Sequence, residues 1–155
     1  EGVKVGIGNP RAVCVGLYAV EVLEKNGYLV DFRDRIAVQA RSCSATASLV
    51  AMDKVDAILG WRVFGEWQPE KIDIVPLEPG NIPRLAYIPA AVSSYSENPE
   101  LAGRFIEFLN SPQGRDIFAK WGYIPSEEKA RTYAPDAEIG GTYDLPALFT
   151  REGGT

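Results

Sequence analysis

The sequence predicts an α/β domain in which helices flank a mostly parallel, mixed sheet. Short runs of β-branched and other apolar residues alternate with longer amphipathic runs, in the order βαβαβ, then two strands, then two helices. This alternation favours parallel strands joined by crossover helices. Composition agrees, since 46% of the 155 residues are hydrophobic and 24% are charged, as in ordinary globular domains.

The first half of the chain shows this alternation most clearly. The first apolar run is β-branched and bounded by glycines, as in a short buried strand. The next run begins at Gly16 and stops at Gly27, and Glu21 and Lys25 form an i,i+4 pair in the favourable order. Ser42 offers an N-cap for a later helix. We therefore expect strands at 3–7, 36–39 and 56–60 and helices at 16–26 and 42–52.

The second half predicts two more strands and two helices. The strands are expected at 72–76 and 84–92, with a turn at 79–81 between them. Asn98-Pro99 and Ser111-Pro112 each place a capping side chain before a proline at the first helical position. The first of these two helices is predicted to bury its apolar side chains, which are Leu101, Phe105, Ile106, Phe108 and Leu109.

The chain is predicted to divide into an α/β domain at 1–124 and an extended C-terminal tail at 125–155. Prolines, glycines and charges dominate the tail, and its apolar stretches are short. We expect the tail to pack partly on the domain or to reach a partner. The mixed-sign charges at 31–35 fit a solvated connection.

Composition argues against several classes of function. The sequence has no histidine, which removes Ser-His-Asp and Cys-His catalysis and nearly every zinc site, so we expect neither an enzyme nor a metal centre. A net charge of −5 argues against nucleic-acid binding. No apolar run reaches the roughly 18 residues of a membrane span. The start at Glu1, without Met or a leader, fits a processed secreted protein or a fragment.

A glycine-containing loop joins the first predicted strand to the first predicted helix. It includes Gly6-Ile-Gly8-Asn9-Pro10, but Arg11 stands where a dinucleotide-binding fingerprint needs its third glycine, and no acidic residue ends the second strand. The N-terminus of a helix leaves backbone N–H groups without partners and carries partial positive charge. The loop therefore favours a small anion over a nucleotide.

Several stretches, taken in order, carry a family resemblance. They are Gly8-Asn9-Pro10, Gly16-Leu17-Tyr18-Ala19, Ser48-Leu49-Val50, Asp56-Ala57-Ile58, Trp61, the strand from Tyr87 to Val92, and Asn98-Pro99 through Gly114 to Trp121-Gly122-Tyr123. Together they resemble the second lobe and C-terminal helices of periplasmic molybdate/tungstate-binding proteins, over roughly residues 3–123.

The resemblance implies a solute-binding protein outside the cytoplasm, periplasmic or extracellular, that feeds an ABC transporter. Its fold would be a periplasmic-binding-protein-like lobe, and its ligand a tetrahedral oxyanion, molybdate or tungstate, held between two lobes. The implied partners are a membrane ABC permease and a first lobe with serine-type ligands, which precedes this segment or belongs to another chain. Any membrane anchor would lie outside this segment, and no cofactor is expected.

The resemblance also assigns ligand positions. The first backbone donor falls on Val15, beside Gly16, and the second falls on Cys43, beside Ser44. In the archaeal branch of the family, the position of Cys43 resembles a carboxylate ligand. The family's tyrosine falls on Trp61, whose indole N–H still donates. These departures leave the identity of the anion open.

Three further residues flank the two helix starts. Arg11 and Arg41 are candidates for charge-assisted contacts with the anion, or are solvated or paired with surface acids. If the resemblance holds, Cys14 and Cys43 lie near each other. They then form a disulfide, act as small buried hydrophobes, or contact the ligand through a thiol.

Two other functions remain open. The lobe is a sensor or interaction module that does not serve transport and has weakened ligand binding, or it is an enzyme with a cysteine nucleophile. The enzyme hypothesis is the weaker of the two, because the sequence contains no histidine that could activate the thiol.

Overall fold

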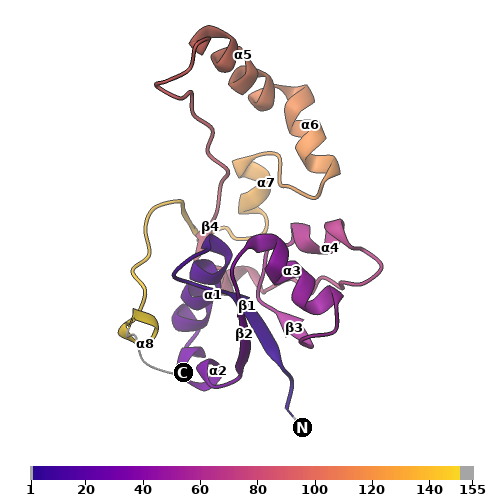
Figure 1. Cartoon of the computed structure of the whole chain (residues 1–155), viewed down its shortest axis with the longest axis vertical. Coiled ribbons are helices and arrows are strands. Elements are labelled where there is room, and N and C mark those ends of the chain that lie inside the picture. The colour runs from indigo at the N-terminus through magenta and orange to yellow at the C-terminus, as the bar shows by residue number, and fades with distance from the viewer. Residues whose placement is uncertain (1, 151–155) are drawn as a thin grey trace.

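The computed structural model describes residues 2–150, and Figure 1 shows its elements. A parallel three-stranded sheet lies in the lower part of the molecule as Figure 1 shows it. Its central strand β1 (Val5–Gly8) lies between β2 (Ile36–Ala40) and β3 (Ala57–Ile58). The predicted α/β class with a parallel sheet is confirmed.

Two crossover helices cover opposite faces of this sheet. They are α1 (Cys14–Lys25) and α3 (Cys43–Ala51). Adjacent residues of a strand point to opposite sides. Accordingly, Ile7 is fully buried in a cluster with Val20 and Leu23 of α1, whereas a Cβ on Gly6 would meet Leu49 of α3. The sheet is therefore buried on both sides, as parallel sheets generally are.

Two short helices have no counterpart in the sequence prediction. They are α2 (Leu29–Arg33) and α4 (Val63–Trp67). The stretch at 31–35, expected to be a solvated connection, mostly belongs to α2 and the turn after it. Leu29 explains this helix, because its buried side chain joins the cluster around Ile7.

The middle of the chain forms less strand than its sequence predicts. Residues 72–76 form no strand, because no neighbouring backbone pairs with them, and Val75 is 86% exposed. The expected turn is a short 3-10 helix, η1 (Pro79–Asn81). Of the strand expected at 84–92, only β4 (Arg84–Leu85) forms, and the strand expected at 56–60 shortens to β3. Alternating apolar residues become a strand only where a partner strand is available.

A buried ion pair fastens a second, two-stranded sheet to α1. In this sheet β4 pairs in parallel with β5 (Glu138–Ile139). The guanidinium of Arg84 donates to the Glu21 carboxylate at 2.9–3.0 Å and pairs with Glu138 at 2.9 Å. Glu21 is only 1% exposed, so the predicted pairing with Lys25 is wrong. Hydrogen bonds with Glu21 raise the pKa of Arg84 above its usual value.

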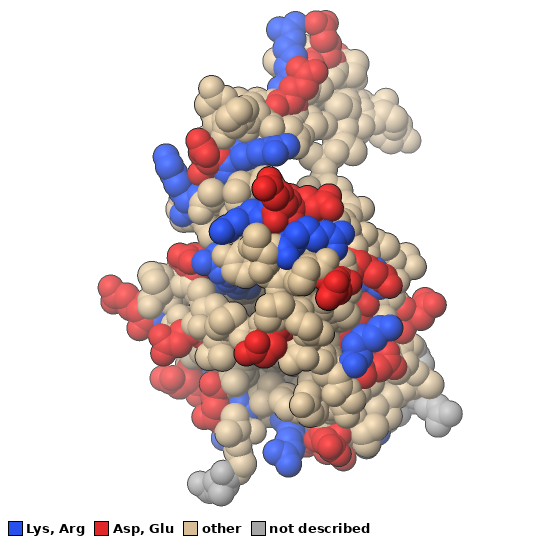
Figure 2. Space-filling view, turned by 180° about the vertical axis from the view of Figure 1, so that it is seen from behind, with Lys and Arg blue, Asp and Glu red and all other residues tan. Residues whose placement is uncertain are grey.

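A helical hairpin stands apart from the sheets, at the top of Figure 1. It consists of α5 (Pro99–Asn110) and α6 (Pro112–Lys120). Both helices begin as predicted, since the side chains of Asn98 and Ser111 accept N–H groups of the first turns. Figure 2 shows this hairpin from behind, with charges of both signs interspersed over the molecule.

The predicted burial of the apolar face of α5 is wrong. No residue of α5 is buried, and Leu101 and Phe105 are 59% and 60% exposed. Phe108 is 46% exposed, while Ile106 and Leu109 are half-buried. A helical period shows which side chains share a face, but not whether a surface covers them. Within residues 2–150, the main neighbour of α5 is α6.

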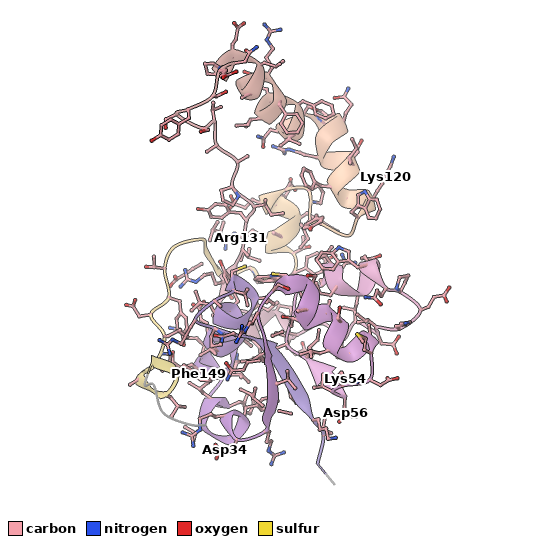
Figure 3. All side chains as sticks on the ribbon, in the orientation of Figure 1. Asp34, Lys54, Asp56, Lys120, Arg131 and Phe149 are labelled. Atoms are coloured by element: carbon pink, nitrogen blue, oxygen red, sulfur yellow. The ribbon has the colours of Figure 1, made fainter. Side chains whose placement is uncertain are left out.

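The C-terminal segment is more structured than an extended tail. It contains α7 (Glu127–Arg131), β5 and α8 (Ala147–Thr150). Arg131, labelled in Figure 3, donates to the carbonyls of Pro135 and Ala137 and so holds the turn after α7. The Tyr143 hydroxyl donates to Glu24 of α1 at 2.7 Å. This segment packs on the domain.

Some expectations fall outside the described chain. Glu1 and residues 151–155 of the predicted tail lie beyond the residues that the structure describes. Across residues 2–150, none of the helices combines the length and apolar character that crossing a membrane requires.

Candidate functional site

The N-termini of α1 and α3 lie at the same edge of the parallel sheet. Each helix follows the carboxyl end of one of two paired strands, where Gly8 lies opposite Ala40. The backbone N–H of Asn9 donates to the Ala40 carbonyl at 2.7 Å and joins the two loops. In α/β folds, ligands bind preferentially at this edge.

The loop between β1 and α1 is held closed by Asn9. Its side chain accepts one backbone N–H at 2.9 Å, and its carbonyl accepts the next two at 3.0 and 2.9 Å. A Cβ at Gly16 would collide with the carbonyl oxygen of Gly8, so only glycine lets α1 start this close to the strand. This close approach fixes where the first turn of α1 points.

The N-terminus of α3 is capped by the side chain of the residue that precedes the helix. The Ser42 hydroxyl accepts the Ala45 N–H at 3.0 Å and lies 3.1 Å from the hydroxyl of Ser44. The predicted N-cap is therefore confirmed. Ser44 is exposed, and its hydroxyl contacts that of Ser42.

Cys43, the first residue of α3, packs against the buried cluster that contains Val15 from the first turn of α1. Val15 and Trp61 act as hydrogen-bonding neighbours that lower the pKa of the Cys43 thiol, and Cys14 is a neighbour that raises it. These four residues are called the Cys43 site below. Two of the three N–H donors that the resemblance assigns to an anion, those of Val15 and Trp61, therefore have a thiol of the protein itself as a neighbour.

Electrostatics at the Cys43 site favour the neutral thiol. Burial raises the pKa of Cys43, and the charge and hydrogen bond of Cys14 raise it further. The hydrogen bonds from Trp61 and Val15 act in the opposite direction, but the net pKa lies above the ordinary value for cysteine. The Cys43 thiol beside these N–H donors is thus uncharged at neutral pH.

Trp61 combines a packing role with a polar one. Its ring packs against the buried cluster of Val15, Ala47, Val63 and Phe64. Tyr18 lies edge-on to it, with ring centroids 5.0 Å apart. Burial raises the pKa of Tyr18, which keeps that hydroxyl protonated. Tyr18 is thus a neighbour of the site that the sequence analysis did not assign, although it belongs to the Gly16-Leu17-Tyr18-Ala19 stretch.

Other candidate residues are less closely engaged. Arg11 and Arg41 are exposed, and within residues 2–150 neither forms an ion pair. Cys14 is exposed and Cys43 is half-buried, and both are free thiols in this structure rather than the disulfide that the sequence left open.

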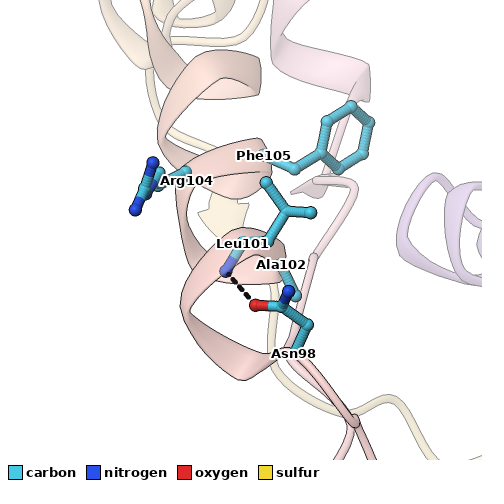
Figure 4. Close-up of a pocket in the computed structure, with 5 residues that line it drawn as sticks. All are labelled: Asn98, Leu101, Ala102, Arg104 and Phe105. Carbon is cyan, nitrogen blue, oxygen red and sulfur yellow. Dashed lines mark hydrogen bonds between the residues drawn. The ribbon is translucent and has the colours of Figure 1, made fainter.

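A surface hollow lies elsewhere, on α5. It has a volume of about 590 Å³ and is lined by Asn98, Leu101, Ala102, Arg104 and Phe105. Figure 4 shows that all five come from one helix and its cap, with the Asn98 side chain accepting the Leu101 N–H. An open hollow on a single helix lacks the converging polar groups of a ligand site. It belongs to the uncovered face of the hairpin.

Comparison with known proteins supports a binding function. A family model described as bacterial extracellular solute-binding protein matches residues 1–124. A curated protein of Haemophilus influenzae, described as a binding protein, is 28% identical over 128 residues, which are 82% of this chain and 51% of that protein. The chain thus spans about half the length of the curated relative that it matches. No solved structure matches the chain.

Proposed function

Because the chain belongs to the family of bacterial extracellular solute-binding proteins, we propose that it holds a small tetrahedral oxyanion, molybdate or tungstate, for a membrane ABC permease. The family binds solutes outside the cell, and the curated relative is likewise described as a binding protein. The choice of anion rests on the resemblance to molybdate/tungstate-binding proteins and on the geometry of the Cys43 site.

The observation that carries the proposal is the convergence of donors on Cys43. Val15 in the first turn of α1, Cys43 at the start of α3 and Trp61 pack in one cluster, and the N–H groups of Val15 and Trp61 both lower the pKa of the Cys43 thiol. Sulfur is a weak acceptor, whereas an N–H donated to an anionic oxygen forms a stronger, charge-assisted bond. Rotation of the Cys43 side chain would let an oxyanion take over both donors and the positive ends of both helices.

A second lobe would complete the site. The chain spans about half of its curated relative, and the apolar face of α5 is uncovered in this structure. A site open to water on one side binds weakly, because water screens each charge and competes for each donor. We propose that the other half of the family fold covers the hairpin and closes over the anion.

An interaction module without transport is the second candidate. Two observations favour it: the Cys43 thiol already occupies the donors, and Leu101 and Phe105 leave a large apolar surface exposed. In that case the helical hairpin would bind a partner and the oxyanion would bind weakly or not at all.

Calorimetric titration of the two-lobed protein with molybdate, tungstate and sulfate separates the two candidates. We expect molybdate and tungstate to bind and sulfate to bind more weakly. Replacing Trp61 by Phe keeps an aromatic side chain but removes the indole N–H, which should weaken binding by about 10-fold or more, since a hydrogen bond to a charged group contributes roughly 1.5–3 kcal/mol.

The matched control is Trp67→Phe. Trp67 packs on Phe64 with ring centroids 5.0 Å apart and is not part of the Cys43 site, so this variant should bind like the parent. An absence of heat with both molybdate and tungstate would rule out the oxyanion proposal and favour the interaction module.

A further inference from the structure

The segment that joins β4 to α5 has the sequence of a strand but no partner strand. Residues 86–92 run from the second sheet to the hairpin without forming a helix or a strand, as Figure 1 shows. All of them are exposed, and Tyr87 and Ile88 are 63% and 66% exposed. Among the described residues, none forms a backbone hydrogen bond with this segment. An extended run with open backbone groups and apolar side chains is a template for strand pairing.

The pairing of β4 determines which backbone groups of this segment remain free. The carbonyls of Pro83 and Leu85 accept N–H groups of β5 and of the residue after it at 3.0 and 3.1 Å. Along a strand, the backbone groups of every second residue point to the same edge, so the odd-numbered residues at β4 face β5. A strand that continues from β4 with this alternation turns its even-numbered residues toward the open edge.

A proline in the segment agrees with this assignment. Pro89 has no backbone N–H, so it cannot donate on the edge that its backbone faces, and proline within sheets is therefore confined to edge strands. Because position 89 is odd-numbered, the missing N–H falls on the same edge as β5. The N–H groups of Ile88, Ala90 and Val92 are left intact on the open edge. Two independent observations thus leave the same edge available for pairing.

The other half of the family fold is the partner that fits this edge. The stretch matched in the curated relative is 51% of that protein, so a further lobe of similar size is available. Residues 86–92 lead toward α5, whose side chains Leu101 and Phe105 are also uncovered. A strand followed by helices with an open apolar face needs a further layer to bury it. One lobe that supplies a sheet would cover the strand edge and the hairpin together.

We propose that residues 87–92 add an edge strand to a sheet of this other lobe, through the backbone groups of Ile88, Ala90 and Val92. The backbone groups of the odd-numbered residues face away from the new partner. The inference rests on the second lobe of the proposed function but not on the anion, since strand pairing uses none of the groups of the Cys43 site.

Amide hydrogen exchange of the two-lobed protein without any anion, followed by NMR, tests the proposal. We expect the amides of Ile88, Ala90 and Val92 to exchange at least about 100-fold more slowly in the two-lobed protein than in the 155-residue chain alone, because pairing protects them. The amides of Tyr87 and Ala91 should exchange rapidly in both.

Two proline variants separate the two edges of the strand. Ala90→Pro removes one of the paired N–H groups, and Ala91→Pro is the matched control on the opposite edge. Both positions lie in extended chain, which proline and the residue before it favour. In the two-lobed protein, Ala90→Pro should speed the exchange of Ile88 and Val92 by about 10-fold or more, whereas Ala91→Pro should leave it unchanged. If Ala90→Pro fails to fold, the alternation in the parent protein still decides.

The contrary outcomes are distinct. Protection of Tyr87 and Ala91 instead, or no protection of the segment in the two-lobed protein, would overturn the proposal. Slow exchange that appears in the 155-residue chain as its concentration rises would also overturn it, because a second copy would then be the partner. Oxyanion binding without protection would overturn this inference alone, and protection without oxyanion binding would overturn the proposed anion alone.

Discussion

At the scale of single residues, the carboxylate of Glu21 is the most deeply buried charge of the described chain. It is 1% exposed and accepts bonds from the guanidinium of Arg84, whose side chain is 8% exposed. Removing one member of such a pair leaves the other charge without compensation in the core. The ion pair therefore connects α1 to the second sheet at a point where little water reaches.

Glu21→Gln tests the contribution of this ion pair. We expect it to lower the free energy of unfolding by about 3 kcal/mol, at the lower end for buried pairs because Glu138 still faces Arg84. Glu100→Gln is the control, since its pair with Arg104 is exposed on both sides and should contribute less than about 1 kcal/mol. Urea unfolding measures both. Equal effects in the two variants would contradict the assigned role of Glu21.

The thiol of Cys43 makes a second prediction at this scale. Because its pKa is raised, Cys43 is protonated at pH 7, and its alkylation by iodoacetamide should rise about 10-fold per pH unit until the pH passes the usual cysteine value. Cys14→Ala removes two of the contributions that raise this pKa, so the alkylation midpoint should move to lower pH.

Mass spectrometry of the labelled peptides measures the alkylation of Cys43 separately from that of Cys14. The parent protein gives the reference curve under the same conditions. A midpoint that stays in place or rises in Cys14→Ala would show that the two thiols do not interact as the structure indicates.

At the scale of elements, the corner between α5 and α6 depends on one glycine. Gly114 is buried, and a Cβ there would collide with the carbonyl oxygens of Phe108 and Leu109. We expect Gly114→Ala to destabilise the hairpin by about 1–3 kcal/mol through overpacking. Gly103→Ala is the control, because its Cβ would meet open space inside α5 and alanine favours a helix.

Hydrogen exchange of peptides from residues 99–120 measures the stability of the hairpin. The Gly114→Ala variant should exchange faster than the parent there, and the Gly103→Ala variant should exchange equally or more slowly. Unchanged exchange in Gly114→Ala would mean that the two helices do not pack as described.

The sequence predicts elements well where the signal is local. Ser42, Asn98 and Ser111 each cap a helix as expected, because capping depends only on neighbouring residues. The missing strand at 72–76 and the exposed face of α5 depend on whether another segment lies alongside, which a local pattern does not contain.

The candidate site shows the same division between local and distant information. The chain pattern predicts both helices, the first from Gly16 although it begins at Cys14, and the second with its cap at Ser42. The resemblance adds Val15, Cys43 and Trp61 as donors. That Val15 and Trp61 both lie near Cys43 depends on how α1, α3 and the segment before α4 pack together. The pairing of Glu21 with Arg84 likewise spans 63 residues, so periodicity alone assigned Glu21 to the wrong partner.

At the scale of the whole molecule, the chain is a covered sheet with an uncovered helical hairpin. Leu101, Phe105, Phe108, Ile117 and Trp121 are each between 46% and 63% exposed on α5, on α6 and just after it. Soluble monomers rarely leave an apolar surface of this kind without a binding role. The hairpin is therefore the part of the molecule that we expect to depend most on another lobe or chain.

A dye that fluoresces on apolar surfaces tests this expectation. We expect anilinonaphthalene sulfonate to bind the isolated chain, and the double variant Leu101→Ser/Phe105→Ser to lose about half of that fluorescence. Val75→Ser is the control, since Val75 is 86% exposed but lies far along the chain from the hairpin. Fluorescence that is equal in both variants would show that the dye binds elsewhere.

The central claim is that an oxyanion binds at the Cys43 site, and NMR titration of the isotope-labelled chain with molybdate tests it most directly, because even weak binding shifts individual resonances. We expect the Val15 amide and the Trp61 indole N–H resonances to move as molybdate is added, while the Trp67 indole N–H stays in place. Resonances that move only around Leu101 and Phe105 on α5, or that do not move at all, would contradict the claim.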